Sequence, residues 1–376
     1  MTVPPGGLGL PDVPPATPET WPVVRDELVE ALAEHVYGRT PRPAWTSRVE
    51  AIERAAPRTL GPGTRTQLRL TFDDGAARRT MTVLLLLPGT PAETAPVVLG
   101  LNFDGNHTAV RDPEVALPAG WVPDRAEPAT DAHRTSDGGR GAAEAAWAAD
   151  RLLAAGVGVA TLYAGDAEPD HPAGHVEGVR ALAAPGADPP WGALGVWAWA
   201  LSRAREAVAR EPGVRPDAIV AVGHSRMGKA ALWAAAQDEG FAAVVSNGSG
   251  CGGASLTRHH SGEGIADITR AFPHWFTPGF AAFAGREEEL PVDQHFLLAA
   301  TAPRPLYVAS AADDHWADPV GELLATTCAH EVHRAVGGGA VGHHLRPGGH
   351  AITAEDWEHV LVFLRRHVPG FGGAGR

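Results

Sequence analysis

The chain has 376 residues and a formal net charge of −13, because 44 acidic side chains outnumber 31 basic ones. An acidic protein without runs of lysine or arginine repels nucleic acids and anionic membranes, so we expect neither as a partner. No apolar segment approaches the ~20 residues that a membrane-spanning helix needs, and two cysteines define no disulfide framework.

The two ends of the chain differ in composition from the rest. Residues 1–20 are rich in proline and glycine and predict an irregular arm, and residues 369–376 predict a glycine-rich tail. No low-complexity linker divides residues 21–368, so we predict a single domain there. The N-terminus lacks a basic segment followed by an apolar one, which indicates a cytoplasmic protein unless a leader has been removed.

Between these ends, the hydrophobic pattern predicts alternating helices and strands. They are a helix over Trp21–Tyr37, strands Thr66–Phe72, Met81–Leu87 and Val97–Leu101, a helix Gly141–Ala155, strand Val157–Tyr163, helix Ala193–Ala209, strand Ala218–Val222, helix Ala230–Gln237, strands Ala242–Asn247 and Pro305–Ser310, and a last helix. This order predicts an α/β fold, with a mostly parallel sheet, helices on both faces and an antiparallel start. The loop-rich stretches 104–140 and 248–292 should shape a substrate cleft.

One short segment, Gly223–Lys229, joins the predicted strand Ala218–Val222 to the next helix. A sharp strand-to-helix turn holds its residue in a strained conformation and exposes the side chain at the positive end of the helix. Ser225 is therefore a candidate nucleophile. The spacing departs from G-x-S-x-G because Met227 takes the place of the second glycine, and an ordinary turn is the alternative interpretation.

Candidates for the acid and the base follow in the order that such a serine requires. Asp314 comes directly after the strand Pro305–Ser310, with Asp313 as the reserve, and His350 lies in a glycine-rich loop before the last helix. In such a set the histidine accepts the serine proton and returns it to the leaving alcohol, while the carboxylate fixes the imidazole tautomer.

Five motifs together are more specific than the serine turn alone: Gly223–Lys229, Ser249–Gly253, Pro273–Phe276, Asp314–Pro319 and Arg346–His350. With them the sequence resembles the glucuronoyl esterases of carbohydrate esterase family 15, especially the bacterial branch. The resemblance runs from about Val36–Arg39 to the last helix. It implies an α/β-hydrolase fold, no cofactor, and activity on esters of glucuronic acid or its 4-O-methyl ether, including those that join xylan to lignin alcohols.

The resemblance also implies roles for individual residues. Ser225 would be the nucleophile, His350 the base, and Arg226 a stabiliser of the oxyanion, where a positioned donor lowers the barrier. A further backbone donor is expected from the loop Asn102–His107.

Four more residues would contact the sugar. Lys229 and Glu263 would hydrogen-bond it, and Trp275 and Trp316 would stack on sugar rings. For the glutamate and the tryptophans, surface exposure or core packing is the alternative.

One position departs from the family pattern. Many members carry a glutamate after the strand that follows the nucleophile helix, and this chain has Gly248 there. The role of the orienting acid therefore falls on Asp314.

Two other functions stay open at this stage. An acetylxylan esterase or general carboxylesterase would use the same catalytic residues, and a noncatalytic carbohydrate-binding protein could share the scaffold. The histidine pairs His259–His260 and His343–His344 have no known metal-ligand spacing, so we expect no metal. The expected partner is a small or oligosaccharide uronate ester, and the sequence does not indicate an oligomeric state.

Overall fold

The computed structural model describes residues 8–41, 45–89, 94–125, 129–182, 188 and 190–372. Most of the predicted arm is therefore visible, and residues 8–20 contain no helix or strand. Residues 1–7 of the arm and 373–376 of the predicted tail lie outside the described residues.

The chain divides into two compact units. The first unit comprises Met1–Pro41, Gly186–Ala198 and Ala221–His367, and the second comprises Arg42–Pro185, Trp199–Val220 and Val368–Arg376. Strand β8 (Val214–His224) and helix α5 (Ala193–Val208) each have residues in both units. The single domain over residues 21–368 stays a prediction.

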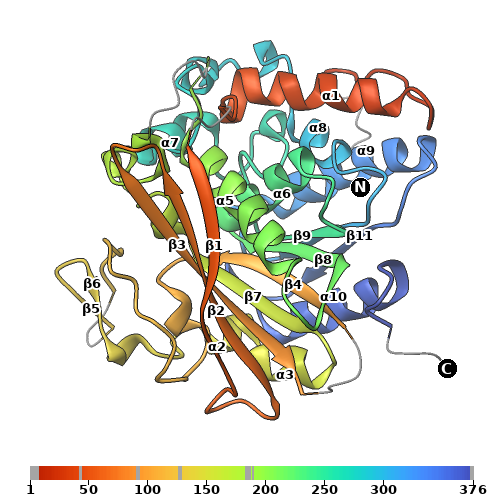
Figure 1. The fold of residues 1–376 in the computed structure, drawn as a ribbon. Coiled ribbons are helices and arrows are strands. Elements are labelled where there is room, and N and C mark those ends of the chain that lie inside the picture. Colours follow the sequence, from red (N-terminus) through yellow and green to blue (C-terminus); the bar gives the residue numbers. More distant parts are fainter. Residues whose placement is uncertain are drawn as a thin grey trace. The chain divides into compact units, whose positions relative to one another are not determined.

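Antiparallel strands open the second unit. β1 (Thr46–Ala55), β2 (Gly63–Asp73) and β3 (Arg78–Pro88) pair in succession, and β7 (Gly158–Tyr163) continues antiparallel to β3. β4 (Ala95–Asn102) then pairs parallel with β7. The predicted antiparallel start is therefore confirmed, as the red and orange ribbons of Figure 1 show.

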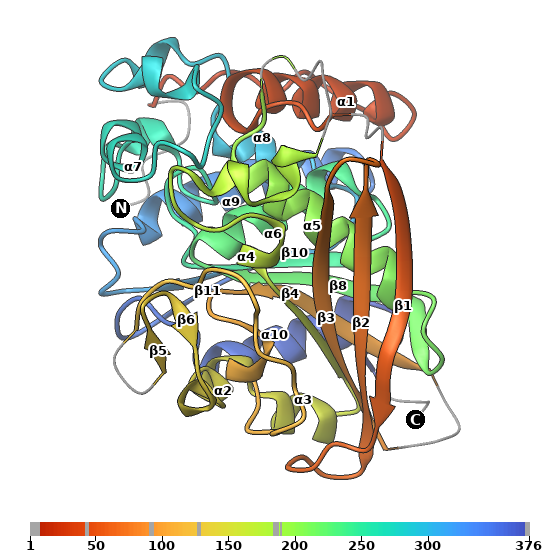
Figure 2. The same cartoon turned by 60° about the vertical axis from the view of Figure 1, so that its left-hand side comes forward.

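The first unit holds the strands that position the candidate site. β9 (Ala243–Asn247), β10 (Leu306–Ala311) and β11 (Val341–Arg346) run parallel, which is the arrangement expected for strands joined by helices. Figures 1 and 2 show one group of helices on one face of these strands and α10 on the other. The group is α6 (Arg226–Gln237), α8 (Gln294–Ala299) and α9 (Pro319–Ala335), and α10 spans Ala354–His367.

The remaining helices and strands are short or lie at the edges. They are α1 (Trp21–Leu32) with a π-helical extension (Ala33–Tyr37), α2 (Glu144–Trp147), α3 (Ala149–Ala154), α4 (Ala164–Ala167), α7 (Ile265–Ala271), β5 (Thr130–Asp131) and β6 (Arg134–Thr135), together with 3₁₀ turns Asn106–Thr108, Asp137–Gly139, Gly174–Val176, Val179–Ala181, Thr257–His259, Phe280–Phe283 and Glu287–Glu289. Among the described residues, no helix is both long and apolar enough to cross a membrane.

Three elements differ from the sequence predictions for identifiable reasons. The helix expected over Gly141–Ala155 is split into α2 and α3, because Ala148 adopts a left-handed conformation with φ 45° that interrupts the helical hydrogen bonds. β1 has a largely exposed and polar surface, so its sequence gives no apolar alternation. β11 is rich in histidine and glycine, and neither residue signals a strand.

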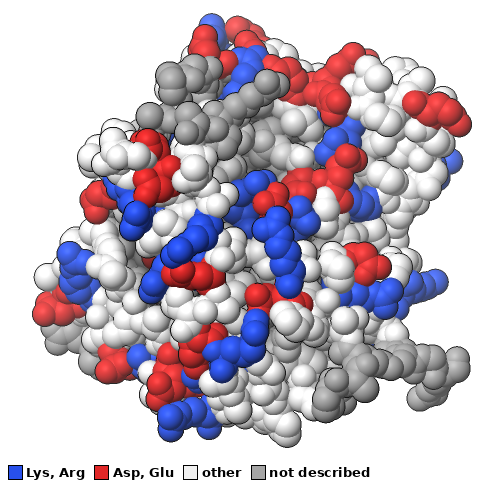
Figure 3. All heavy atoms as spheres, viewed as in Figure 1, with Lys and Arg blue, Asp and Glu red and all other residues white. Residues whose placement is uncertain are grey.

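A buried ion pair anchors the loop that follows β4. Arg65 on β2 donates to Asp112, whose carboxylate also accepts from the backbone N–H of Arg58 at 2.8 Å. Both side chains are at most 2% exposed. Other ion pairs, such as Arg69–Glu50, are much more accessible to solvent. Figure 3 shows acidic and basic side chains interspersed over the face in view.

This contrast gives a stability prediction. Asp112→Ala should lower the free energy of unfolding by about 1.5–3 kcal/mol, because it removes one of the two carboxylates that bind the buried Arg65 guanidinium and leaves Glu53 as the other. Glu50→Ala, which removes an exposed partner of Arg69, should cost less than about 1 kcal/mol. Urea unfolding of both variants measures the difference, and equal losses would show that burial does not govern the Arg65 pair.

Candidate active site

The turn at Ser225 has the geometry that the sequence predicts. β8 ends at His224, α6 begins at Arg226, and Ser225 between them has φ 57° and ψ −133°. A non-glycine residue in this region is strained, which is typical of a nucleophile turn. Glycine is required at position 223, because a Cβ there would lie 2.1 Å from the carbonyl oxygen of Met227. Met227 itself is buried, which explains why a core side chain replaces the usual second glycine.

A hydrogen bond joins the predicted acid to the predicted base. His350 Nδ1 lies 2.6 Å from Asp314 Oδ2. Burial alone would raise the pKa of Asp314, but the hydrogen bond from His350 and the positive charge that His350 carries when protonated hold that pKa below its ordinary value. Asp313 is exposed and accepts from the backbone N–H of Gly348, so Asp314 is the aspartate in contact with His350.

Gly248 lies beside this hydrogen bond. Its φ is +52°, and a Cβ built there would be 3.3 Å from Asp314 Oδ2 and 3.5 Å from His350 Nδ1. A side chain at this position would thus approach the same nitrogen of His350. The absence of an acid at position 248 leaves that nitrogen to Asp314.

Two residues that the sequence predictions missed support the same histidine. The His224 ring packs 4.5 Å from the His350 ring, and His224 Nδ1 lies 2.7 Å from Asn247 Oδ1. Asn247 also accepts from the backbone N–H of Ser225 at 2.9 Å. Burial is the main reason why the pKa of His224 falls to about 4, so this ring is neutral at pH 7. Only its place before Ser225 could have drawn attention to it.

Arg226 and Trp275 contact each other. The Arg226 guanidinium lies 5.6 Å from the centre of the Trp275 ring, within the range of a cation–π interaction. Trp275 is only 3% exposed and stacks on Phe272 at 3.8 Å. A ring that is so little exposed and already stacked on Phe272 favours support of Arg226 over stacking on a sugar.

Lys229 at the start of α6, together with Glu263 and Trp316, forms a second group of predicted site residues. Lys229 Nζ donates to the carbonyl oxygens of Ser249 and Cys251, and burial lowers its pKa. Burial raises the pKa of Glu263, against the opposing effects of the Lys229 charge and a hydrogen bond from the Trp316 side chain. Trp316 is 60% exposed, so its ring can meet a ligand.

Two buried carboxylates hold the loops that carry these residues. Glu322 accepts from Ser310 Oγ at 2.5 Å and from the backbone N–H of Gly250 at 3.0 Å. Asp318 accepts from Ser255 Oγ and binds His259 Nδ1, both at 2.8 Å. The loops after β9 and β10 are thereby tied together.

In the part of the chain that the structure describes, no group of three or more His, Cys, Asp or Glu residues is arranged to hold a metal ion. Cys251 and Cys328 are free thiols. The loop Asn102–His107, predicted to supply a backbone donor, belongs to the second unit, where Asn102 Oδ1 accepts from the N–H of Gly105; that donor stays a prediction.

Three features are those of an α/β-hydrolase: the parallel strands, the strained serine after β8, and the acid–histidine contact in the loops after β10 and β11. The chain is a carboxylic ester hydrolase. Both predictions are confirmed by comparison with known proteins.

The chain belongs to the glucuronoyl esterases of carbohydrate esterase family 15. It is 36% identical over 372 residues to carbohydrate esterase MZ0003 from an unknown prokaryotic organism, covering 92% of this chain and 84% of that protein. The family model for glucuronyl esterase of fungi matches residues 186–337. A 4-O-methyl-glucuronoyl methylesterase of Podospora anserina is 33% identical over 147 residues, which are 36% of this chain and 30% of that protein.

Solved structures of family 15 esterases are also similar to this chain. A promiscuous family 15 esterase from a marine bacterial metagenome matches with a TM-score of 0.86 and 33% identity, covering 96% of this chain and 98% of the other. The glucuronoyl esterase from Solibacter usitatus matches with a TM-score of 0.85 and 36% identity, covering 94% and 96% of the two chains.

The acid assignment leads to a kinetic prediction. Asp314→Asn should lower kcat on an ester substrate by about 10³–10⁴-fold, because an amide cannot hold the same imidazole tautomer or stabilise its cation. Asp313→Asn is the matched control and should keep kcat within about twofold, since its carboxylate contacts only loop backbone. Steady-state kinetics decide between them, and a larger loss from the Asp313 change would reassign the acid.

Glu322 predicts a pH dependence of stability. Burial raises its pKa from an ordinary 4.5 to about 7, so between these values the folded protein holds a proton that the unfolded chain has released. Its contribution to stability therefore falls as pH rises from about 4.5 to 7. Glu322→Gln should reduce the loss of unfolding free energy between pH 5 and pH 8, measured by urea titration. Glu331→Gln, an exposed change on the same helix, should leave the loss as in the wild type.

Proposed function

We propose that this protein hydrolyses esters of glucuronic acid or its 4-O-methyl ether through an acyl-enzyme on Ser225. The observation that carries the proposal is the 2.6 Å contact between His350 Nδ1 and Asp314, combined with the strained turn at Ser225. Family membership supports the ester class, and the named activity of the Podospora relative supports the uronate as the acyl group.

His350 is the base in this proposal. With Nδ1 directed at Asp314, Nε2 is the nitrogen that accepts the proton of Ser225 Oγ as the hydroxyl attacks the ester carbonyl. The resulting imidazolium donates that proton to the leaving alcohol as the C–O bond breaks. Water then attacks the acyl-enzyme with His350 again as base, which releases the uronic acid and restores the serine.

Arg226 stabilises the negative oxygen of each tetrahedral intermediate. Its backbone N–H lies in the first turn of α6, where the helix dipole favours an anion. Its guanidinium is held against Trp275 and adds a full positive charge. Loss of one such donor costs roughly 3 kcal/mol of transition-state stabilisation in comparable sites.

The sugar on the acyl side contacts Glu263, Lys229 and Trp316. The Glu263 carboxylate accepts a hydrogen bond from the Trp316 side chain and feels the Lys229 charge, and the hydrogen bond orients it before a ligand arrives. A carboxylate can accept hydrogen bonds from two neighbouring sugar hydroxyls, and the exposed tryptophan offers an apolar face. An acetyl ester has no sugar on the acyl side, which separates this proposal from an acetylxylan esterase.

Substrate comparison tests the proposal. Glu263→Gln should lower kcat/KM for benzyl glucuronate by about ten- to a hundredfold, the size of a lost charge-assisted hydrogen bond. The same variant should hydrolyse 4-nitrophenyl acetate within about threefold of the wild-type rate, because acetate does not reach this carboxylate.

The control is Glu288→Gln, an exposed change in the same long loop, which should affect neither substrate. Equal losses on both esters after the Glu263 change would contradict a sugar contact. Failure of the wild type to cleave benzyl glucuronate, with activity on acetate retained, would favour a general carboxylesterase.

A further inference from the structure

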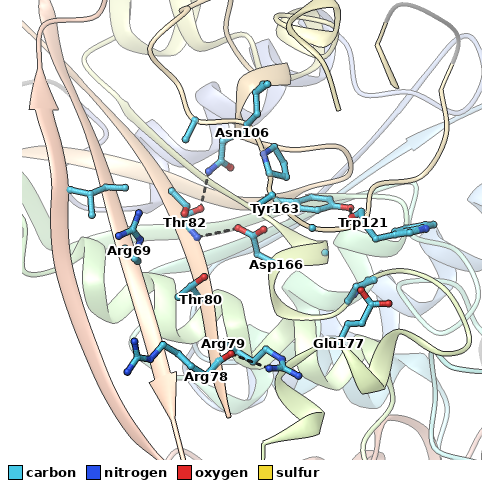
Figure 4. Close-up of a pocket in the computed structure, with 18 residues that line it drawn as sticks. Arg69, Arg78, Arg79, Thr80, Thr82, Asn106, Trp121, Tyr163, Asp166 and Glu177 are labelled. Carbon is cyan, nitrogen blue, oxygen red and sulfur yellow. Dashed lines mark hydrogen bonds between the residues drawn. The ribbon is translucent and has the colours of Figure 1, made fainter. Parts of the chain in front are cut away.

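The second unit contains a polar cavity of ≈ 360 Å³. This volume lies within the ~300–1,000 Å³ usual for small-molecule pockets. Figure 4 shows its walls: the first half of β3, a loop that carries Trp121, and the segment from Tyr163 to Asp166.

The cavity borders an open edge of β3. Within the described part of the chain, β7 pairs with β3 at Val83–Leu86, and no strand pairs with the preceding residues of β3 on that side. There the N–H of Thr82 donates to Asp166 Oδ2 at 3.1 Å, and its carbonyl accepts from Asn106 Nδ2 at 2.8 Å. Because main-chain groups of alternate residues point to the same side of a strand, Thr80 directs its N–H and C=O toward the cavity.

Asp166 supplies a further polar group. Burial raises its pKa to about 7, opposed only by the hydrogen bond from Thr82, so near neutral pH the carboxyl is present in both donor and acceptor forms. Figure 4 shows the carboxyl at the middle of the cavity wall, and no ion pair involves it among the described residues.

The three arginines that line the cavity have hydrogen-bond or ion-pair partners within the protein. Arg69 pairs with Glu50 and Arg78 with Asp73. The Arg79 guanidinium donates to the carbonyl oxygens of residues 78, 176 and 178, and Glu177 also lines the cavity. Two of the three cations are therefore paired with carboxylates, and the Arg79 guanidinium, which has five N–H donors, keeps donors beyond these three bonds.

From these groups we infer that this cavity, whose lining residues all belong to the second unit, is a binding site for a short neutral saccharide. Sugar hydroxyls both donate and accept hydrogen bonds, which matches the strand edge at Thr80, the carboxyl of Asp166 and the guanidinium of Arg79. Pro118, Trp121 and Tyr163 also line the cavity and add apolar surface for the C–H groups of a ring.

Isothermal titration calorimetry of the full chain with xylotriose, cellotriose and maltotriose tests the site. The wild type should bind at least one of them with a Kd in the range of about 10⁻⁵–10⁻³ M. Thr80→Trp, which fills the cavity from an exposed strand position, should weaken that binding at least about tenfold. Ser47→Trp on β1 is the matched control outside the cavity and should bind as the wild type does.

A second variant and two further titrations complete the test. Asp166→Ala should also weaken binding about tenfold, so the inference does not depend on the folding of one variant, which circular dichroism checks. Absence of binding to all three sugars, or tighter binding of inorganic phosphate, would overturn it. So would binding that survives Thr80→Trp but is lost in Lys229→Ala, because it would then belong to the proposed active site. Ester hydrolysis is not the readout, so failure of the proposed function would leave this result interpretable.

Discussion

The hydrogen bond between Asp314 and His350 is the contact on which the proposed chemistry depends. In that proposal it determines which imidazole nitrogen acts as the base, and its two residues come from loops after different strands, β10 and β11. Glu322 and Asp318 hold the surrounding loops in place, because each buried carboxylate joins the loop after β9 to the segment that carries Asp314.

The buried carboxyl groups beside the site lower the stability of the fold, but their hydrogen bonds hold the site loops in place. Transfer of a carboxylate from water is unfavourable, and the raised pKa of Glu322 reports that cost. Hydrogen bonds from Ser310 and the Gly250 backbone offset part of it and fix the spacing of two strands. The strained backbone at Ser225 also lowers the stability of the fold. The packing of β8 and α6 on either side of the turn keeps the residue in this conformation.

Much of this could be predicted from the sequence because it depends on local order. A strand, a sharp turn and a helix in succession specify Ser225, and an acid after the next-to-last strand specifies Asp314. His224 and Glu322 could not be found in this way, since their contacts join residues far apart in the chain. Trp275, predicted from the resemblance to stack on a sugar, has contacts with Phe272 and Arg226 that the sequence does not reveal.

Covalent labelling tests the central claim most directly. Reaction with a serine-directed fluorophosphonate, followed by peptide mapping with mass spectrometry, should place one label on Ser225. The fraction of protein labelled there should equal the fraction of esterase activity lost, because the strained turn and His350 make this hydroxyl reactive. Activity that persists after complete labelling of Ser225, or that disappears while Ser225 stays unlabelled, would contradict the account.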